Sequence, residues 1–259
     1  MPDTLIATPG WALVQGASRG IGYALVEALL SRVNVLGVVA TSRRPHQSST
    51  LADLSERFGP RLITVPLDVE APSSIEAAAR EVSARLPEDE ALRIVINSTG
   101  LLHDGAHQPE KRLENVEAEA LARAFAVNAT GPILVAQQFM PLIPKEGPSV
   151  FASLSARVGS ISDNRLGGWY AYRASKAAQN MLTKTLAIEW ARRLPECICV
   201  GLHPGTVDTQ LSAPFRSGVS AQALFSPTRA AGALLDVLGG LDQGDSGSCF
   251  AWDGQRIEP

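Results

Sequence analysis

The stretch "GASRGIG" at residues 16–22 stands between the apolar run "WALVQ" and the helical run "YALVEALL". Three glycines and one arginine therefore crowd the point where a buried strand would pass into a helix. Glycine permits a tight turn, lets backbone N–H groups approach a pyrophosphate and lets a helix pack close to a strand. The start of the helix adds free N–H donors and the positive end of its dipole. The stretch predicts a phosphate-binding turn.

The spacing of the glycines narrows this interpretation. Gly16, Gly20 and Gly22 follow the pattern Gly-x-x-x-Gly-x-Gly, which differs from the Gly-x-Gly-x-x-Gly fingerprint, and no Lys-Ser/Thr pair of a P-loop follows. An ordinary turn between strand and helix is the alternative. The position of the turn, directly after the first strand of the chain, favours a dinucleotide site.

Outward from this turn, short β-branched runs alternate with helical stretches. The runs predict strands at 12–15, 35–41, 61–67, 92–98, 149–154, 198–203 and 248–252. The stretches between them predict helices at 20–31, 48–58, 73–85, 114–143, 170–194 and 227–238. This alternation predicts an α/β fold of Rossmann type, a doubly wound parallel sheet of about seven strands with helices on both faces.

Composition limits the class of protein. The chain has 259 residues, 45% of them hydrophobic, enough for the core of a single domain over residues 1–259. A net charge of −3 argues against a nucleic-acid partner. No apolar stretch is long enough to span a bilayer, the N-terminus lacks an export signal, and three cysteines fit a reducing compartment. We expect a cytoplasmic protein without a membrane partner.

The end of the second predicted strand bears on the choice of nucleotide. It reads "ATSRRP" at residues 40–45, with Ser42 followed by Arg43 and without an acidic residue nearby. A carboxylate here would bind the ribose 2′-hydroxyl of NAD, whereas guanidinium groups bind a 2′-phosphate in a fork. Arg19 reaches the same place from the glycine turn. The pattern predicts NADP(H); the alternative for the arginines is a solvated turn.

Tyr172 and Lys176 stand four residues apart on the predicted helix 170–194, which places both side chains on one face. A free tyrosine has a pKa of about 10, and a neighbouring ammonium group lowers it. Such a tyrosine donates a proton to a carbonyl oxygen as hydride arrives, or removes it in the reverse direction. The alternative is a packed tyrosine beside a surface lysine, and Tyr170 lacks a lysine at this spacing.

Together, the glycine turn and "YRASK" at 172–176 resemble the short-chain dehydrogenase/reductase family over nearly the whole chain. Residues 159–178 resemble its sniffer-like carbonyl reductases and the C-factor signalling group. Further matches are "LDV" at 67–69, "NSTG" at 97–100, "VNATGP" at 127–132 and "HPGTVDT" at 203–209; Gln15, Ser98 and Thr99 depart from the family pattern. The resemblance implies that the cofactor is bound by Gly16, Ser18, Arg19, Gly20, Ile21, Gly22, Ser42, Arg43, Asp68, Val69, Asn97, Ser98, Gly100, Tyr172, Lys176, Pro204, Gly205, Val207 and Thr209.

The resemblance also implies a catalytic set of Tyr172, Lys176, Asn128 and a serine, with Asn128 holding a water beside the lysine. The family's serine stands three residues before a glycine, but in "SLSARVG" at 153–159 that position is Ala156. Ser155 is one residue earlier, and alternation along a strand points neighbouring residues to opposite faces. We expect Ser155 to be the catalytic serine, with Ser153 and Ser160 as the alternatives.

The segment after the Pro-Gly turn is expected to form a substrate lid at about residues 208–226. It is short and mostly small or apolar, with Asp208 and Arg216 as its one charge pair, so an apolar aldehyde or ketone is expected rather than a strong anion. The spacing of His103 and His107, four residues apart, would suit a metal site on a helix. Gly105 between them and Pro109 after them argue against such a helix. We predict no metal and a solvent loop.

Two functions follow from the resemblance. The first is an NADPH-dependent reductase that converts a carbonyl compound to an alcohol, and the intact set of Tyr172, Lys176 and Asn128 favours it. The second is an NADP-bound signalling or binding protein with incidental catalysis, which Ala156 favours. The long helices at 114–143 and 170–194 resemble those that pair between subunits in the family, which implies a homodimer or homotetramer; burial within one chain is the alternative.

Overall fold

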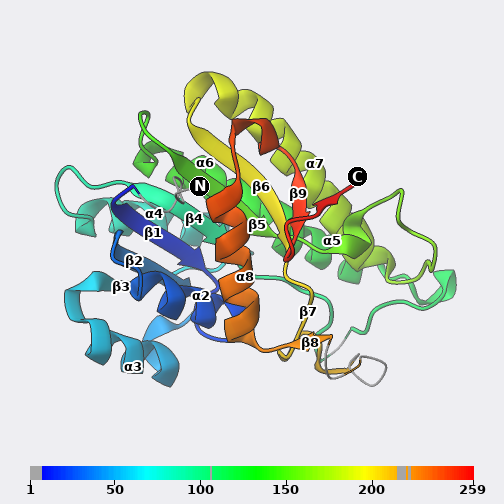
Figure 1. Cartoon of the computed structure of the whole chain (residues 1–259). Coiled ribbons are helices and arrows are strands. Elements are labelled where there is room, and N and C mark those ends of the chain that lie inside the picture. Colours follow the sequence, from blue (N-terminus) through cyan, green and yellow to red (C-terminus); the bar gives the residue numbers. More distant parts are fainter. Residues whose placement is uncertain (1–7, 106, 215–219, 221–222) are drawn as a thin grey trace.

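A computed structural model describes residues 8–105, 107–214, 220 and 223–259. Its centre is an eight-stranded sheet in the order β10-β9-β6-β5-β4-β1-β2-β3 (Figure 1). The strands are β1 (Gly10–Gln15), β2 (Val35–Ser42), β3 (Leu62–Pro66), β4 (Leu92–Asn97), β5 (Ser149–Leu154), β6 (Cys197–His203), β9 (Cys249–Ala251) and β10 (Arg256–Ile257). The strand order reverses between β1 and β4, and in open α/β sheets this is where ligands bind.

The predicted strands are all present, each within two residues of its expected bounds. Seven strands run parallel, and the short β10 pairs with β9 in the antiparallel direction. The doubly wound parallel sheet is therefore confirmed, with one more strand than the seven expected. A tight turn at Asp253 and Gly254 folds β10 back on β9, and its two residues are too few to show a pattern in the sequence.

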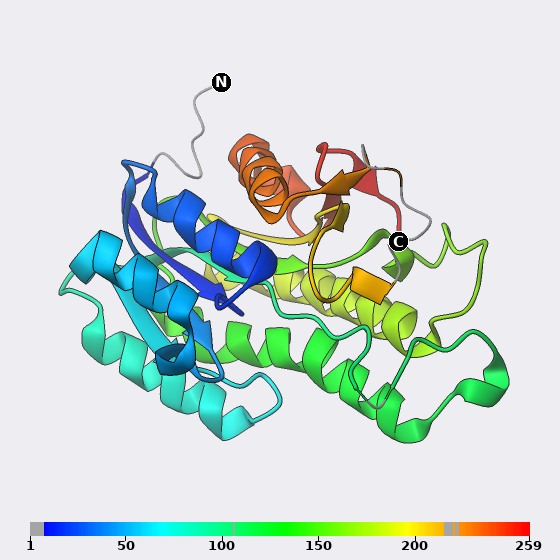
Figure 2. The same ribbon diagram turned by 90° about the horizontal axis from the view of Figure 1, so that it is seen from below.

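Helices cover both faces of the sheet (Figure 2). One face carries α2 (Gly20–Leu30), α3 (Ser49–Phe58) and α8 (Pro227–Gly240). The other carries α4 (Pro72–Arg85), α5 (Ala118–Phe125), α6 (Gly131–Phe139) and α7 (Tyr170–Arg193). Short 3-10 turns lie at Pro45–Gln47, Gly59–Arg61, Leu113–Asn115, Met140–Leu142, Arg157–Gly159 and Gln243–Asp245.

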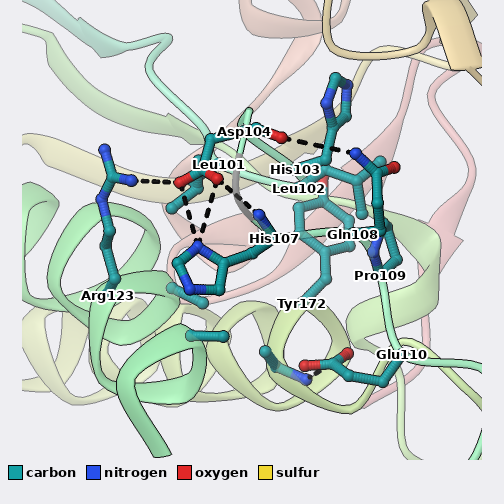
Figure 3. Close-up of a pocket in the computed structure, with 13 residues that line it drawn as sticks. Leu101, Leu102, His103, Asp104, His107, Gln108, Pro109, Glu110, Arg123 and Tyr172 are labelled. Carbon is teal, nitrogen blue, oxygen red and sulfur yellow. Dashed lines mark hydrogen bonds and ion pairs between the residues drawn. The ribbon is translucent and has the colours of Figure 1, made fainter. Parts of the chain in front are cut away.

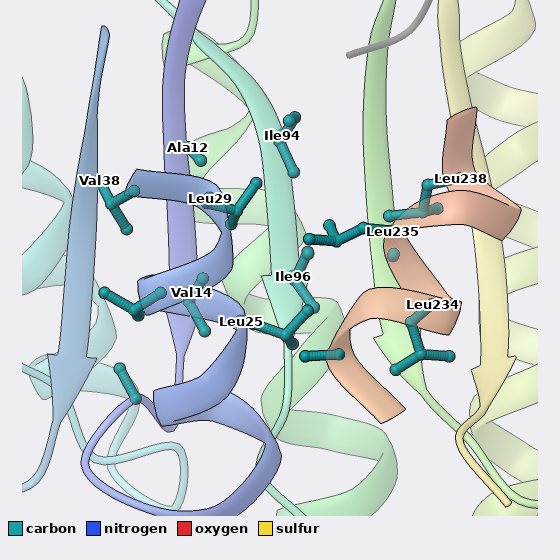
Figure 4. Close-up of a cluster of buried hydrophobic side chains, with 14 of the residues drawn as sticks. Ala12, Val14, Leu25, Leu29, Val38, Ile94, Ile96, Leu234, Leu235 and Leu238 are labelled. Carbon is teal, nitrogen blue, oxygen red and sulfur yellow. The ribbon is translucent and has the colours of Figure 1, made fainter. Parts of the chain in front are cut away.

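Alternation along the strands divides the core between the two faces. Ala12 and Val14 of β1 pack with Leu25 of α2 and Leu234 of α8 (Figure 4), whereas Leu13 lies in the cluster on the opposite face. A parallel sheet covered on both sides buries nearly all residues of its strands, so its strands read as continuous apolar runs. This is why the strands were predictable from the sequence.

The predicted helix at 114–143 is divided. After the turn at Leu113–Asn115 the backbone is extended at Glu117, so α5 begins only at Ala118. Between α5 and α6 the segment Ala126–Thr130 forms a π-helical turn in which Gly131 N–H donates to Ala126 O. Pro132 has no N–H to donate to the carbonyl four residues earlier, which belongs to Asn128, and this favours the wider turn.

The segment after β6 contributes a two-stranded sheet of β7 (Thr206–Val207) and β8 (Leu224–Phe225). The lid expected at 208–226 begins directly after β7 and includes β8, but its residues 215–219 and 221–222, and with them Arg216, lie outside the described residues. Over the described part of the chain, no helix combines the length and apolar character needed to cross a membrane.

Candidate active site

A cleft of about 1610 Å³ opens at the carboxyl ends of the parallel strands. Most residues predicted to bind the cofactor or substrate line it: Gly16, Ser18, Arg19, Gly20, Ile21, Gly22, Ser42, Arg43, Asp68, Val69, Ser98, Gly100, Ser155, Tyr172, Lys176, Pro204 and Thr209. Asn97, Asn128, Gly205 and Val207 are described residues that do not line it. The fold thus brings together segments spread along most of the sequence, from Gln15 to Pro227.

The glycine turn requires the absence of side chains. Gly16 has a φ of +85°, and a Cβ there would lie 2.4 Å from Thr99 Oγ1. A Cβ on Gly22 would lie 2.1 Å from the carbonyl oxygen of Gly16. Both contacts are shorter than any real Cβ tolerates, so the first turn of α2 can sit this close to β1 only with glycine. The turn forms a bare backbone cradle at the start of a helix, which fits a pyrophosphate.

Two departures from the family pattern contact each other behind this turn. Gln15 Nε2 donates to Thr99 Oγ1 at 2.7 Å. Ser98 Oγ donates to the carbonyl oxygen of Gln15 at 2.7 Å, so the end of β4 braces the end of β1. The sequence analysis treated these three positions as separate departures and did not predict this contact, because only the register of β1 against β4 brings them together.

The end of β2 fits a phosphate-bearing ribose. Ser42 Oγ is buried without a hydrogen-bond partner, although Ser42 lines the cleft. Arg43 and Arg44 are exposed, and neither forms an ion pair with a described residue. Arg19 Nη1 donates to Gln210 Oε1, so the glycine turn already contacts the segment after β6. An unpartnered hydroxyl beside unpaired guanidinium groups provides donors for a 2′-phosphate.

A charged network borders the cleft near Asp68. Arg123 of α5 binds Glu70 at 3.1 Å and also donates to Asp104, which in turn accepts from His107 N–H at 2.8 Å (Figure 3). The network holds the loop after β4 against α5. The sequence analysis did not predict this network, since Glu70 and Arg123 lie 53 residues apart in the sequence.

His103 is not in a plain solvent loop as predicted. It lines the cleft, and its Nε2 lies 3.0 Å from the carbonyl oxygen of Leu211. The expected loop therefore folds over the cleft and meets the segment after β6. Among the described residues, no cluster of three His, Cys, Asp or Glu side chains suits a metal ion.

Tyr172 and Lys176 lie where the spacing predicts, one turn apart near the start of α7 and both in the cleft. Lys176 is 2% exposed, and its Nζ donates to Leu154 O at 2.7 Å and to Gln179 Oε1 at 3.0 Å. The same Nζ lies 5.8 Å from the centre of the Tyr172 ring. The ammonium group therefore lies within cation–π distance of the tyrosine ring.

Burial dominates the protonation of both groups. It raises the pKa of Tyr172 to about 12 and lowers the pKa of Lys176 to about 7. The predicted lowering of the Tyr172 pKa by Lys176 is therefore wrong for this structure, because burial penalises the phenolate and raises the pKa instead. At neutral pH the tyrosine holds its proton and is a proton donor.

The start of α7 is held by a buried carboxylate. Glu110, which is 4% exposed, accepts from Ala171 N–H through Oε2 at 3.3 Å, and its backbone oxygen accepts from Trp169 N–H. A carboxylate at this position satisfies free N–H groups of the first helical turn. Glu110 and Tyr172 both border a small cavity of about 30 Å³ (Figure 3).

Asn128 is fully buried within the π-helical turn. Its Oδ1 accepts from Leu101 N–H at 2.7 Å, and its Nδ2 donates to Leu101 O at 2.8 Å and to Ser175 Oγ at 2.9 Å. These bonds fix the backbone after β4 and link it to α7 beside Lys176. The predicted water-holding role stays a prediction.

Of the three serine candidates, the structure brings Ser155 to the cleft. Ser155 lines it together with Tyr172 and Lys176, whereas Ala156 is buried and does not. The Ser155 hydroxyl donates to Asn180 Oδ1 of α7 at 2.6 Å. Ser153 is turned to Asn97 inside the sheet, and Ser160 lies in the loop after β5, 3.2 Å from Ser162 Oγ.

Open α/β sheets bind nucleotides in a crevice at the point where the strand order reverses, and this cleft occupies that point. Fold and site therefore define a dinucleotide-binding α/β protein with a tyrosine and a lysine facing the ligand. A family model described as short chain dehydrogenase matches residues 10–220. The chain belongs to the short-chain dehydrogenase family.

The chain is also similar to individual relatives. C-signal of Myxococcus xanthus is 33% identical over 145 residues, which cover 56% of this chain and 82% of C-signal. The structure of an NADPH-bound carbonyl reductase from chicken fatty liver is 29% identical with a TM-score of 0.85, covering 98% of this chain and 96% of that one. The carbonyl reductase Sniffer of Drosophila melanogaster, 24% identical over 97% of this chain and all of its own, shares the fold with a TM-score of 0.85.

Proposed function

We propose that the protein is an NADPH-dependent reductase that converts an aldehyde or ketone to an alcohol. The observation that carries the proposal is the position of Tyr172, which is protonated and faces the cleft above the buried Lys176. The NADPH-bound carbonyl reductase of the same fold supports it. Within this proposal, residues 1–259 act as one domain, and the lid lies at about 208–226.

The residues of the cleft account for the cofactor. The bare backbone of the glycine turn holds the pyrophosphate, while Ser42, Arg43 and Arg19 hold the 2′-phosphate. Asp68 and Val69 border the adenine, and Pro204 and Thr209 border the nicotinamide end. When bound, the cofactor supplies the hydride. Asn97, Gly205 and Val207 do not line the cleft and support the neighbouring residues that do.

The chain supplies the proton. The raised pKa of Tyr172 keeps the phenol protonated at neutral pH, so it donates to the carbonyl oxygen as negative charge develops there. The Lys176 ammonium group stabilises the phenolate that remains. Ser155 donates a second hydrogen bond to the same oxygen, and Asn128 holds a water beside the lysine that relays protons to bulk solvent.

The cleft fits an apolar carbonyl compound of modest size. Near Tyr172 it is bordered by Leu101, Leu211 and Pro204, and among the described residues no cluster of Arg or Lys surrounds the tyrosine to clamp an anion. Asp208, the acidic residue of the proposed lid, is exposed. We propose aldehydes, ketones and dicarbonyls as the substrate class.

One observation favours a second function. Ala156 stands where the family places its serine, and the chain is similar to C-signal. In this alternative the bound nucleotide shapes a surface for signalling, and turnover is incidental. A homodimer or homotetramer suits either function, since α7 exposes Met181 and Ile188.

The test follows NADPH absorbance with purified protein over a panel of aldehydes, ketones and dicarbonyls, alongside Tyr172→Phe. We expect turnover that falls by about 10³-fold in the variant, with NADPH binding retained. Tight NADPH binding without turnover on any carbonyl would favour the signalling function.

A further inference from the structure

Ser153 in β5 and Ser155 directly after the strand stand two residues apart, and each is paired with an asparagine. Ser153 accepts a hydrogen bond from Asn97 Nδ2 at 3.1 Å. Ser155, two residues on, donates a hydrogen bond to Asn180 Oδ1 at 2.6 Å. The first pair links neighbouring strands deep in the core, whereas the second links β5 to α7 at the cleft. The serine that lines the cleft is therefore the one whose hydrogen is already engaged.

This engagement conflicts with the role of Ser155. A hydroxyl has one hydrogen, so while Ser155 donates to Asn180 it offers the cleft only lone pairs. A carbonyl oxygen accepts hydrogen bonds and cannot use them. For Ser155 to stabilise the developing charge on that oxygen, its hydrogen must turn to the cleft and a donor must replace it on the asparagine side.

Asn180 contains that donor. A side-chain amide has an acceptor oxygen and a donor NH₂ group of nearly equal size, and a half-turn exchanges them. The bond to Ser155 is the one hydrogen bond of the Asn180 side chain among the described residues, so no other partner fixes the amide. After the half-turn, Nδ2 donates to Ser155 Oγ and the serine hydrogen is free for the substrate.

The surrounding residues leave room for this amide. A Cβ on Gly201 of β6 would lie 3.4 Å from Asn180 Oδ1 and 3.2 Å from Cys249 Sγ, so glycine keeps the space beneath the pair open. The Cys249 thiol of β9 also lies next to Ser155, and a thiol is a weak hydrogen-bond partner that does not fix the direction of the hydroxyl.

We propose that Asn180 is a positioning residue that sets the hydrogen-bond direction of Ser155 and makes it a donor to the substrate oxygen. The proposal rests on the proposed carbonyl reduction. It explains how a serine one residue away from the family's usual position serves the reaction, since the amide of Asn180 on α7 sets whether the hydrogen of the Ser155 hydroxyl is engaged or free for the substrate.

A double-mutant cycle tests the proposal. Ser155→Ala and Asn180→Ala are each expected to lower kcat by about 10-fold to 100-fold, with the Kd of NADPH, measured by fluorescence, unchanged. The double variant should lose no more than Ser155→Ala alone, because both changes remove the same hydrogen bond. Losses that multiply, or wild-type kcat in Asn180→Ala, would overturn the proposal.

The direction of the bond is tested by Asn180→Asp at pH 8. Its carboxylate has nearly the same shape but only accepts, so it holds the serine hydrogen and should lower kcat as far as Ser155→Ala does. Asn34→Asp, in the turn before β2 at the other end of the sheet, is the matched control and should keep wild-type kcat. Undiminished kcat in Asn180→Asp would show that the amide N–H is not needed.

The bond itself can be tested without turnover. The shifts in melting temperature of Ser155→Ala and Asn180→Ala should not add in the double variant if the two side chains are coupled. Additive shifts would overturn the proposal whatever the activity. If the shifts are coupled but no carbonyl is reduced, the proposed function fails on its own, and so does the catalytic role of the pair.

Discussion

The two walls of the cleft are built from different material. Around β1 and α2 the wall is backbone, and the closest contacts are those that glycine alone permits at Gly16 and Gly22. Around β5 and α7 the wall consists of buried polar side chains, of which Lys176 and Ser155 are both less than 5% exposed. A backbone wall keeps its shape when neighbouring side chains change, whereas a side-chain wall depends on each member. Variants in the first wall should therefore alter binding, and variants in the second should alter turnover.

The largest effect is expected from Gly22→Ala. The added methyl group would lie 2.1 Å from the Gly16 oxygen and 2.5 Å from Ser98 Oγ, so the turn must open and NADPH binding by calorimetry should be lost. Gly232→Ala in α8 is the control, because no atom lies within 4 Å of its Cβ position. There alanine should raise stability by about 0.5–1 kcal/mol. Retained NADPH affinity in Gly22→Ala would contradict the backbone wall.

The second effect belongs to the opposite wall. Lys176→Met should lower kcat by about 10²-fold. In the wild type, kcat for reduction should fall as pH rises through about 7, because burial lowers the Lys176 pKa to about 7 and the ammonium group is lost above it. Tyr172, with a pKa of about 12, stays protonated over this range. A wild-type profile that is flat from pH 6 to 8 would exclude this account.

A smaller effect is expected at the end of β2. Arg43→Ala should weaken NADPH binding by about 10-fold to 100-fold, the loss of one charge-assisted hydrogen bond of about 1.5–3 kcal/mol. Its affinity for NADH, which lacks the 2′-phosphate, should be unchanged, and so should kcat at saturation. Titration of both nucleotides by fluorescence checks this, and a wild type that binds NADH as tightly as NADPH would refute the arginine site.

The smallest effect concerns the brace behind the glycine turn. Gln15→Leu and Thr99→Val each remove one side of the 2.7 Å bond, and each should cost about 1 kcal/mol of unfolding free energy. The double variant should cost less than the sum of the two. Chemical denaturation measures the cycle. Strictly additive losses would show that the two departures from the family pattern are independent.

The sequence was sufficient for the sheet and the first wall. Buried parallel strands are continuous apolar runs, and a glycine turn can be recognised from its local sequence alone. The prediction of one continuous helix at 114–143 was wrong, because Glu117 adopts an extended backbone and Pro132 has no N–H to donate. The apolar periodicity of the sequence shows neither feature.

The side-chain wall was only partly predictable. Helical spacing placed Tyr172 and Lys176 together, but their pKa values depend on burial, which only the packed structure shows. The contact of His103 with Leu211 joins residues 108 positions apart, and that of Ser155 with Asn180 depends on the angle at which α7 crosses β5. Such long-range pairs leave no periodic signal in one sequence.

The two outer strands of the sheet bear on how the protein behaves at high concentration. Exposed edge strands recruit other chains into aggregates. β3 at one edge has five residues and ends at Pro66, which has no N–H to offer, and β10 at the other edge has two and begins with a charged residue, Arg256. Neither edge is a template for a further strand, so association of this chain through its sheet is disfavoured even when the protein is crowded.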